Sequence, residues 1–245
     1  MPQFCMNGET QKRRLMLGER SWILTHNTDW LGEGWRNVRE KFRPQYPGSC
    51  SRRIESLPST RSGMAESIEP GNHAPKFKLP NANEGSGESH VSLSEVLGDS
   101  GGVVMFTCNH CPYVVGSEGR IEEIAEKARN NGLGFVGINS NDPVKYEADS
   151  WDNMVKRSQR GMTYPYLHDE DQTVATSYGA ERTPEFYLVS SAGVVVYRGR
   201  MDDSPRDPSH ATTNDLSEAI DDYVSGREIS NPRTESIGCS VKWKD

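Results

Sequence analysis

The segment Cys108-Asn109-His110-Cys111-Pro112 restricts the fold of this chain more than any other feature of its sequence. It follows residues 103–106, a continuous apolar run that is typical of a buried strand. After it, residues 121–128 repeat apolar side chains at the spacing of one helix face, and this helix is expected to end at Asn131-Gly132. The cysteine pair is therefore predicted at the junction of a buried strand and an amphipathic helix.

This position favours thiol chemistry. A cysteine at a helix N-terminus faces unpaired backbone N–H groups and the positive end of the helix dipole, and both stabilise a thiolate. Cys111 is one turn after Cys108 and can close a disulfide with it, while Pro112 falls in the first turn, where its missing N–H costs little. His110 adds a nearby positive charge that is expected to lower the pKa of the first thiol and make the pair more oxidising.

Two cysteines at this spacing can also form half of a zinc site. Structural zinc takes four protein ligands, so two further ligands would be needed. The sequence holds no second pair of this kind. Further ligands would have to converge through folding from Cys239, His73, His90, His168 and His210. We therefore favour redox chemistry and expect neither a metal nor another cofactor.

The rest of the pattern alternates strands and helices. Strands are predicted at residues 134–139, 164–167, 186–189 and 194–197, helices at 151–158, 174–178 and 216–224, and a short apolar-alternating piece at 91–97. This order implies an α/β fold in three layers, with a mixed central sheet and helices on both faces. Gly116 and Gly119, at the start of the helix after the cysteines, indicate either a kink or crowded neighbours.

Charge divides the chain into two regions. Residues 1–63 carry 11 Lys and Arg against 6 Asp and Glu, whereas residues 64–245 carry 17 against 29. The first region shows no sustained periodicity, so we interpret it as a disordered N-terminal extension or a non-native start before Met64. A basic amphipathic helix at 30–42 is the alternative. Residues 64–245 form the predicted domain, and their acidity argues against a nucleic-acid partner.

The expected cellular location depends on whether the sequence contains a membrane-spanning or signal segment. Its longest lightly polar run, residues 187–197, is far short of the roughly 20 residues that a membrane-spanning helix needs, and no run has the form of a signal peptide. Five cysteines with one close pair suit a reactive thiol pair better than a disulfide framework. We expect a cytoplasmic protein without a membrane partner.

The string CNHCPYV, with the strand before it, is similar to the thioredoxin fold and more narrowly to its redoxin branch, which includes AhpC/TSA and TlpA-like proteins of bacterial type. The resemblance continues through residues 138–142, 164–167, 169–175, 178–180, 183–186, 197–203 and 237–244. It covers about 70–244 and implies a thioredoxin-like fold with an antioxidant, redox-homeostasis role.

The resemblance also implies roles for individual residues. Cys108 would form a mixed disulfide with the substrate, and Cys111 would resolve it. Pro184 matches the cis-proline that lies against the cysteines in thioredoxin folds, and the backbone of Thr183 would pair with an extended substrate segment; the alternative for Pro184 is the start of an edge strand. The expected catalytic residues are Cys108, His110, Cys111 and Pro184, and the expected substrate-binding residues are Asn109, Pro112 and Thr183.

Two departures from the family pattern matter. Thioredoxin places a buried acid six residues before its first cysteine, where this chain has Gly102, so proton transfer to the resolving thiol is expected to use His110 or water. Relatives often carry a cysteine just before the Thr-Pro pair, where this chain has Arg182. Cys239 is then either an inert packed thiol or a third redox thiol.

The expected function is thiol–disulfide exchange through a redox-active Cys108–Cys111 disulfide, with protein or small-molecule thiols and disulfides as substrates and a cellular reductant as partner. A thiol-dependent peroxidase is the second possibility. The peroxiredoxin motif Pro-x-x-x-Thr/Ser-x-x-Cys is absent, since Met105 stands where it requires Thr or Ser before Cys108. Outside enzymes, the alternatives are a copper or zinc carrier that uses Cys108, Cys111 and a histidine, and a redox-inert interaction domain.

Overall fold

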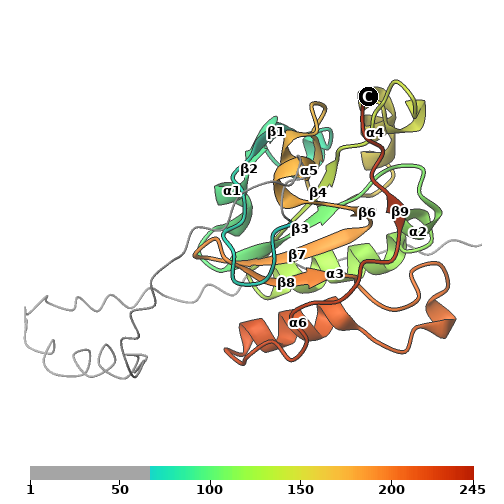
Figure 1. Cartoon of the computed structure of the whole chain (residues 1–245). Helices are drawn as coiled ribbons and strands as arrows, with labels where there is room; N and C mark the ends of the chain where they lie inside the picture. Colours follow the sequence, from blue (N-terminus) through green and yellow to red (C-terminus); the bar gives the residue numbers. More distant parts are fainter. Residues whose placement is uncertain (1–66) are drawn as a thin grey trace, which may run out of the picture. The chain divides into compact units, whose positions relative to one another are not determined.

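A five-stranded mixed sheet forms the centre of the protein (Figure 1). The computed structural model describes residues 67–245, and the predictions made for residues 1–63 lie outside this range. The strand order is β5-β4-β3-β7-β8, in which β3, β4 and β5 are parallel, β7 pairs antiparallel with β3, and β8 pairs antiparallel with β7. These strands are β3 Gly101–Phe106, β4 Gly134–Asn139, β5 Tyr166–His168, β7 Glu185–Ser190 and β8 Val195–Gly199.

Helices cover both faces of this sheet, so the predicted α/β fold class is confirmed. They are α1 Leu93–Leu97, α2 Pro112–Val115, α3 Glu118–Asn130, α4 Trp151–Ser158, α5 Thr173–Tyr178 and α6 Asp215–Val224. Short 3-10 turns occur at Glu84–Ser86, Glu147–Asp149 and Pro208–His210. Among these described helices, none has the length and apolar character that crossing a bilayer requires.

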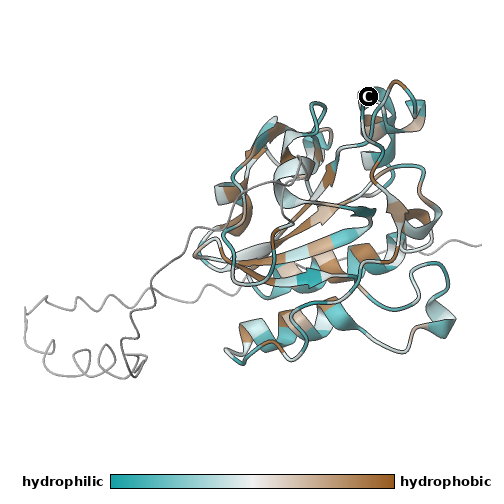
Figure 2. Cartoon of the chain, in the orientation of Figure 1, coloured by the Kyte–Doolittle hydropathy of each residue, from teal (hydrophilic) through white to brown (hydrophobic). Residues whose placement is uncertain are grey.

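The alternation of side chains along β3 separates the two cores. Val103 and Met105 pack with residues of α3 and α6, whereas Val104 and Phe106 pack with residues of α1 and α5 on the opposite face. All six residues of β3 are buried because neighbouring strands flank it and helices cover it. Figure 2 shows the hydrophobic colour concentrated along these central strands.

Two small sheets lie outside the main one. In the first, β1 Lys78–Pro80 pairs with β2 His90–Ser92, so the piece predicted at 91–97 divides into a strand and helix α1. In the second, β6 Arg182–Thr183 pairs antiparallel with β9 Cys239–Ser240. This second sheet joins the segment before Pro184 to a part of the chain more than fifty residues away.

A buried ion pair supports the turn that leads into β6. A guanidinium nitrogen of Arg198 lies 2.8 Å from a Glu185 carboxylate oxygen, and each side chain is at most 2% exposed. The other Glu185 oxygen accepts the backbone N–H groups of Glu181 and Arg182 at 2.8 and 3.1 Å. Glu185 directly follows Pro184, so the pair fixes the backbone on both sides of the predicted proline site.

Candidate active site

The two cysteines lie between the end of β3 and the start of α2. The prediction placed Cys108 at a helix N-terminus, but the helix begins at Pro112 and Cys111 is its N-cap. Proline favours the first helical position because its fixed φ suits the helix and its missing N–H would have no partner there. Pro112 therefore places Cys111, and not Cys108, at the N-terminus of the helix.

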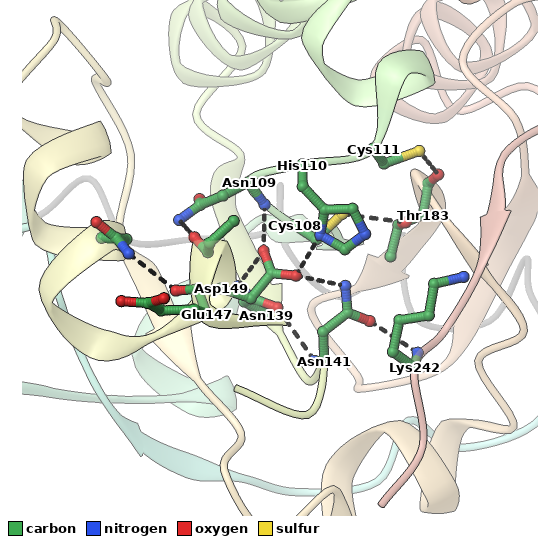
Figure 3. A network of polar contacts seen from close by, with 12 residues as sticks. Cys108, Asn109, His110, Cys111, Asn139, Asn141, Glu147, Asp149, Thr183 and Lys242 are labelled. Carbon is green, nitrogen blue, oxygen red and sulfur yellow. Dashed lines mark hydrogen bonds and ion pairs between the residues drawn. The ribbon is translucent and has the colours of Figure 1, made fainter. Parts of the chain in front are cut away.

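Thr183 contacts both sulfurs. Its hydroxyl lies 3.4 Å from Cys108 Sγ, and its carbonyl oxygen lies 3.1 Å from Cys111 Sγ, which donates a hydrogen bond to it when Cys111 carries a proton. The Thr183–Pro184 peptide bond is cis, as the resemblance implies. Both cysteines are 0% exposed and carry free thiols, so the structure contains the reduced pair. Figure 3 shows the two sulfurs on the same side as Thr183.

The two thiols are hydrogen-bonded to each other, and their pKa values are displaced in opposite directions. The bond with Cys111 raises the pKa of Cys108, and burial and the negative charge of Asp149 act in the same direction. The bond from Cys108 lowers the pKa of Cys111 to about 4, with further hydrogen bonds from Cys239 and from the backbone of α2. The expectation of a lowered pKa at Cys108 is therefore wrong: the lowered pKa belongs to Cys111.

Asp149 is the central acceptor of a hydrogen-bond network on the polar side of the site (Figure 3). Its carboxylate is fully buried and accepts a hydrogen bond from His110 Nδ1 over 2.6 Å. It also accepts the Asn109 backbone N–H at 2.6 Å and the side-chain amides of Asn139 and Asn141 at 3.3 and 2.9 Å. With Nδ1 bonded in this way, Nε2 is the free ring nitrogen of His110, whose side chain is 26% exposed.

Further contacts fix the loop that holds the cysteines. Tyr146 stacks on the His110 ring, with centroids 5.0 Å apart and planes within 7°. The Asn109 side chain accepts from the Tyr166 hydroxyl at 2.8 Å and donates to a backbone carbonyl at 2.7 Å, while Arg157 donates to the carbonyl of Cys108 at 2.6 Å. Asn109 Oδ1 and Nδ2 therefore each make one hydrogen bond that holds the loop, and its substrate-binding role stays a prediction.

The structure thus assembles Cys108, Asn109, His110, Cys111, Pro112, Thr183 and Pro184 at one place. Pro112 is exposed at the edge of this group, whereas Thr183 and Pro184 are buried. In this arrangement the backbone of Thr183 pairs with β9, and its pairing with an extended substrate stays a prediction. An external segment would have to displace β9 to use the same backbone.

Sequence reasoning missed Asp149, which the helical pattern marked only as the start of α4. It also missed Tyr146, Asn139 and Asn141. One signal was available: Asn139 ends β4, the parallel neighbour of β3, and carboxyl ends of parallel strands meet at one edge of a sheet. Asp149 itself has no such signal, because an irregular stretch separates it from β4.

One group of side chains in the described residues has the proximity for a metal. The Cys108 sulfur, a His110 nitrogen and an Asp149 oxygen lie within 4.8 Å of one another. This set differs from the predicted carrier set, because it contains Asp149 instead of Cys111. A metal there would have to replace the His110–Asp149 hydrogen bond, so the arrangement fits a hydrogen-bonded site better than a prepared metal centre.

Comparison with known proteins identifies the family. The AhpC/TSA family profile matches residues 70–198, and the chain belongs to this family. A crystal structure of an uncharacterized conserved protein from Geobacillus kaustophilus is 37% identical with a TM-score of 0.68, covering 76% of this chain and 98% of that one. The structure of a hypothetical protein from Sinorhizobium meliloti 1021 is 32% identical with a TM-score of 0.67, covering 74% and 97%.

A Mycobacterium tuberculosis protein that carries the name "Putative peroxiredoxin" is 27% identical over 128 residues, which are 52% of this chain and 74% of that protein. The fold is thioredoxin-like, and the resemblance to the redoxin branch is confirmed.

Proposed function

We propose that this protein is a thiol–disulfide oxidoreductase whose Cys108 and Cys111 alternate between a dithiol and a disulfide. The observation that carries the proposal is the hydrogen-bonded pair of thiols held against one residue, Thr183. Two sulfurs in mutual contact can be oxidised to a disulfide without a large movement of the chain. Membership of the AhpC/TSA family supports the same chemistry.

Thr183 provides a way to move the charge within the pair. In the resting pair, Cys108 keeps its proton and donates it to the Cys111 thiolate. Transfer of this proton to Cys111 leaves a thiolate on Cys108, and the new Cys111 thiol then donates to the Thr183 carbonyl oxygen. The Thr183 hydroxyl can donate to the Cys108 thiolate at the same time. Both Thr183 contacts therefore stabilise the form in which Cys108 attacks.

The exchange then follows from these positions. The Cys108 thiolate attacks one sulfur of a substrate disulfide, and the other substrate sulfur leaves and takes up a proton. As an imidazolium, His110 can supply that proton from Nε2, since Nδ1 is held by Asp149 and the side chain is partly exposed. Cys111 next attacks the Cys108 sulfur, which forms the Cys108–Cys111 disulfide and releases the second substrate sulfur. A cellular dithiol reductant returns the pair to its starting state.

Reduction of insulin disulfides by dithiothreitol, with the protein as catalyst, tests this proposal. We expect the Cys108→Ser variant to lose catalysis and the Cys111→Ser variant to accumulate a mixed disulfide at residue 108. Equal rates for the wild type and Cys108→Ser would reject the assignment. A mixed disulfide that instead accumulates at residue 111 in Cys108→Ser, with none at 108 in Cys111→Ser, would reverse the two roles.

Thiol-dependent peroxidase activity is the second candidate, because the Mycobacterium tuberculosis relative is named as a peroxiredoxin. Steady-state consumption of hydrogen peroxide coupled to a thiol reductant separates the two activities. Metal analysis of the reduced protein addresses the carrier alternative, which requires stoichiometric copper or zinc that is lost on Cys→Ser substitution. Cytoplasmic location and the identity of the reductant stay predictions.

A further inference from the structure

A third thiol lies against the active-site pair. Cys239 is on β9, directly opposite Thr183 of β6, whose carbonyl oxygen is 3.1 Å from Cys111 Sγ, and Cys239 packs against the same core cluster as Cys111. Cys111 therefore has a thiol on each side: Cys108 within the loop and Cys239 on the neighbouring strand. Neither the loop motif nor the proposed exchange gives Cys239 a role.

The sequence around Cys239 holds this thiol in place. A Cβ on Gly238 would lie 2.2 Å from the carbonyl oxygen of Thr183, so only glycine lets β9 approach so closely. Beyond Cys239, Val241 donates to the Glu181 carbonyl at 3.0 Å and the Lys242 backbone donates to Asn141 at 2.8 Å. Contacts on both sides of Cys239 therefore fix its position against Cys111.

Exposure distinguishes Cys239 from the other two thiols. Cys108 and Cys111 are 0% exposed, whereas Cys239 is half-buried and can be reached from solvent. A thiol outside the protein must meet a sulfur atom along the S–S axis to exchange with it, and burial of both active-site sulfurs restricts this approach. Cys239 is the thiol in contact with the pair that an external thiol reaches first.

The protonation of Cys239 depends on the state of Cys111. Burial, the hydrogen bond with Cys111 and the charge of Cys111 raise the pKa of Cys239 to about 11, while Lys242 and Arg182 oppose them. Once Cys111 is in a disulfide, its charge is gone and the two basic side chains remain. Oxidation of the pair therefore favours ionisation of Cys239.

We propose that Cys239 is a third redox thiol that carries the disulfide from the buried pair to the surface; this rests on the proposed function of Cys108 and Cys111. The Cys239 thiolate attacks Cys111 Sγ in the Cys108–Cys111 disulfide, so that a Cys111–Cys239 bond forms and Cys108 leaves as a thiolate. Cys108 takes up the proton that Cys239 lost, and no net oxidation occurs.

An external dithiol completes the cycle. One of its sulfurs attacks Cys239 and releases Cys111 as a thiolate that becomes protonated. The second sulfur of the dithiol then displaces Cys239, so that the reductant leaves as a disulfide and all three cysteines are thiols.

Disulfide mapping in the full chain with Cys5→Ser and Cys50→Ser tests the proposal. In this background we add Cys108→Ser, treat the protein with diamide and map disulfides by mass spectrometry. We expect more than half of the molecules to contain a Cys111–Cys239 bond. Molecules with only free or externally blocked thiols at both positions would overturn the proposal.

A kinetic measurement gives a second, independent test. The oxidised Cys108–Cys111 form of the same background is reduced with dithiothreitol, and the rate is compared with that of Cys239→Ala. We expect a decrease of at least 10-fold in Cys239→Ala and no change in Ser240→Ala, which alters an exposed neighbour on the same strand. Equal rates for Cys239→Ala and its parent would reject a relay through Cys239.

Failure of the proposed function would look different. In that case the parent protein would form no Cys108–Cys111 disulfide under the same oxidation. The mapping in Cys108→Ser would still report whether Cys111 and Cys239 join.

Discussion

The buried carboxylate of Asp149 holds Nδ1 of His110 at 2.6 Å while the far side of the same ring reaches solvent. Thioredoxin places its acid on the strand before the cysteines, but this chain has Gly102 at that position. Asp149 brings a buried acid to the site from the 3-10 turn Glu147–Asp149 instead, and it contacts the dipeptide between the cysteines. The carboxylate therefore positions His110 rather than contacting a sulfur.

Replacing Asp149 with Asn tests this positioning role. The substitution keeps the shape but removes the carboxylate that fixes the His110 ring, and we expect a loss of roughly 10-fold in the exchange rate, which corresponds to about 1.4 kcal/mol. In a double-mutant cycle with His110→Ala, the two losses in rate should be strongly non-additive, because each substitution removes the same His110–Asp149 hydrogen bond. Asp152→Asn, an exposed acid in the first turn of α4, is the control and should be neutral. Additive losses would contradict the link between Asp149 and His110.

The titration of the reduced pair should reveal the thiolate of Cys111. Thiolate absorbance at 240 nm, followed downward in pH, is expected to persist to about pH 4 and to disappear in Cys111→Ala. Cys239→Ala should raise the pKa of Cys111, because Cys239 donates a hydrogen bond to its thiolate. A thiolate whose pKa is unaffected by Cys239→Ala would argue against this contact.

The same pKa has a consequence for stability. The folded-state pKa of Cys111 is depressed below its ordinary value of 9.0. The contribution of its thiolate to the free energy of unfolding is therefore complete above pH 9, decreases as the pH falls, and is lost once the pH has fallen through about 4. The advantage of reduced wild type over Cys111→Ala in the free energy of unfolding should therefore be greater at pH 8 than at pH 5. Urea unfolding at both values, in the presence of a reductant, measures it.

Breaking the buried ion pair beside Pro184 should destabilise the protein strongly. Arg198→Ala leaves the Glu185 carboxylate buried without its partner, and such losses typically cost about 3–5 kcal/mol. Arg227→Ala removes an ion pair with Asp222 from a side chain that is 58% exposed, and it should cost less than about 1 kcal/mol. Urea unfolding of the two variants compares them directly, and similar losses would contradict a special role for burial.

The two glycines after the cysteines should respond to alanine in opposite ways. A Cβ on Gly119 meets nothing within 4 Å, so Gly119→Ala should stabilise α3 by about 0.5 kcal/mol. A Cβ on Gly116 would lie 3.1–3.2 Å from backbone atoms of Pro112 and Arg206, so Gly116→Ala should be destabilising. Thermal unfolding of both variants checks the pair, and equal effects would show that crowding at Gly116 is unimportant.

Strands and helices were predictable where the spacing of apolar residues alone determines the local structure. The strand predicted at 134–139 is found at Gly134–Asn139. The strands predicted at 186–189 and 194–197 and the helix predicted at 216–224 are found with small shifts of their ends. The strand predicted at 164–167 begins instead at Tyr166, because Pro165 has no N–H to donate to a strand partner. The two glycines indicated a break, and the structure divides the helix between α2 and α3 at Gly116 and Ser117.

Long-range contacts could not be predicted in the same way. The pairing of β6 with β9 involves two residues on each side, which is too short for any periodic pattern. The lowered pKa of Cys111 depends on thiols from two separate segments and on the position of Pro112 in α2. The motif identified the reactive residues, whereas their protonation depends on contacts that form only in the folded chain.

The close packing of Gly238 on Thr183 also affects how the protein is made. Cys108 and Cys111 emerge from the ribosome well before residues 238–242, so β9 cannot cover them during most of translation. Until β9 pairs with β6, Cys111 lacks its neighbour Cys239. The arrangement of the three thiols is therefore complete only after residues 238–242 have been synthesised and have paired with the segment before Pro184.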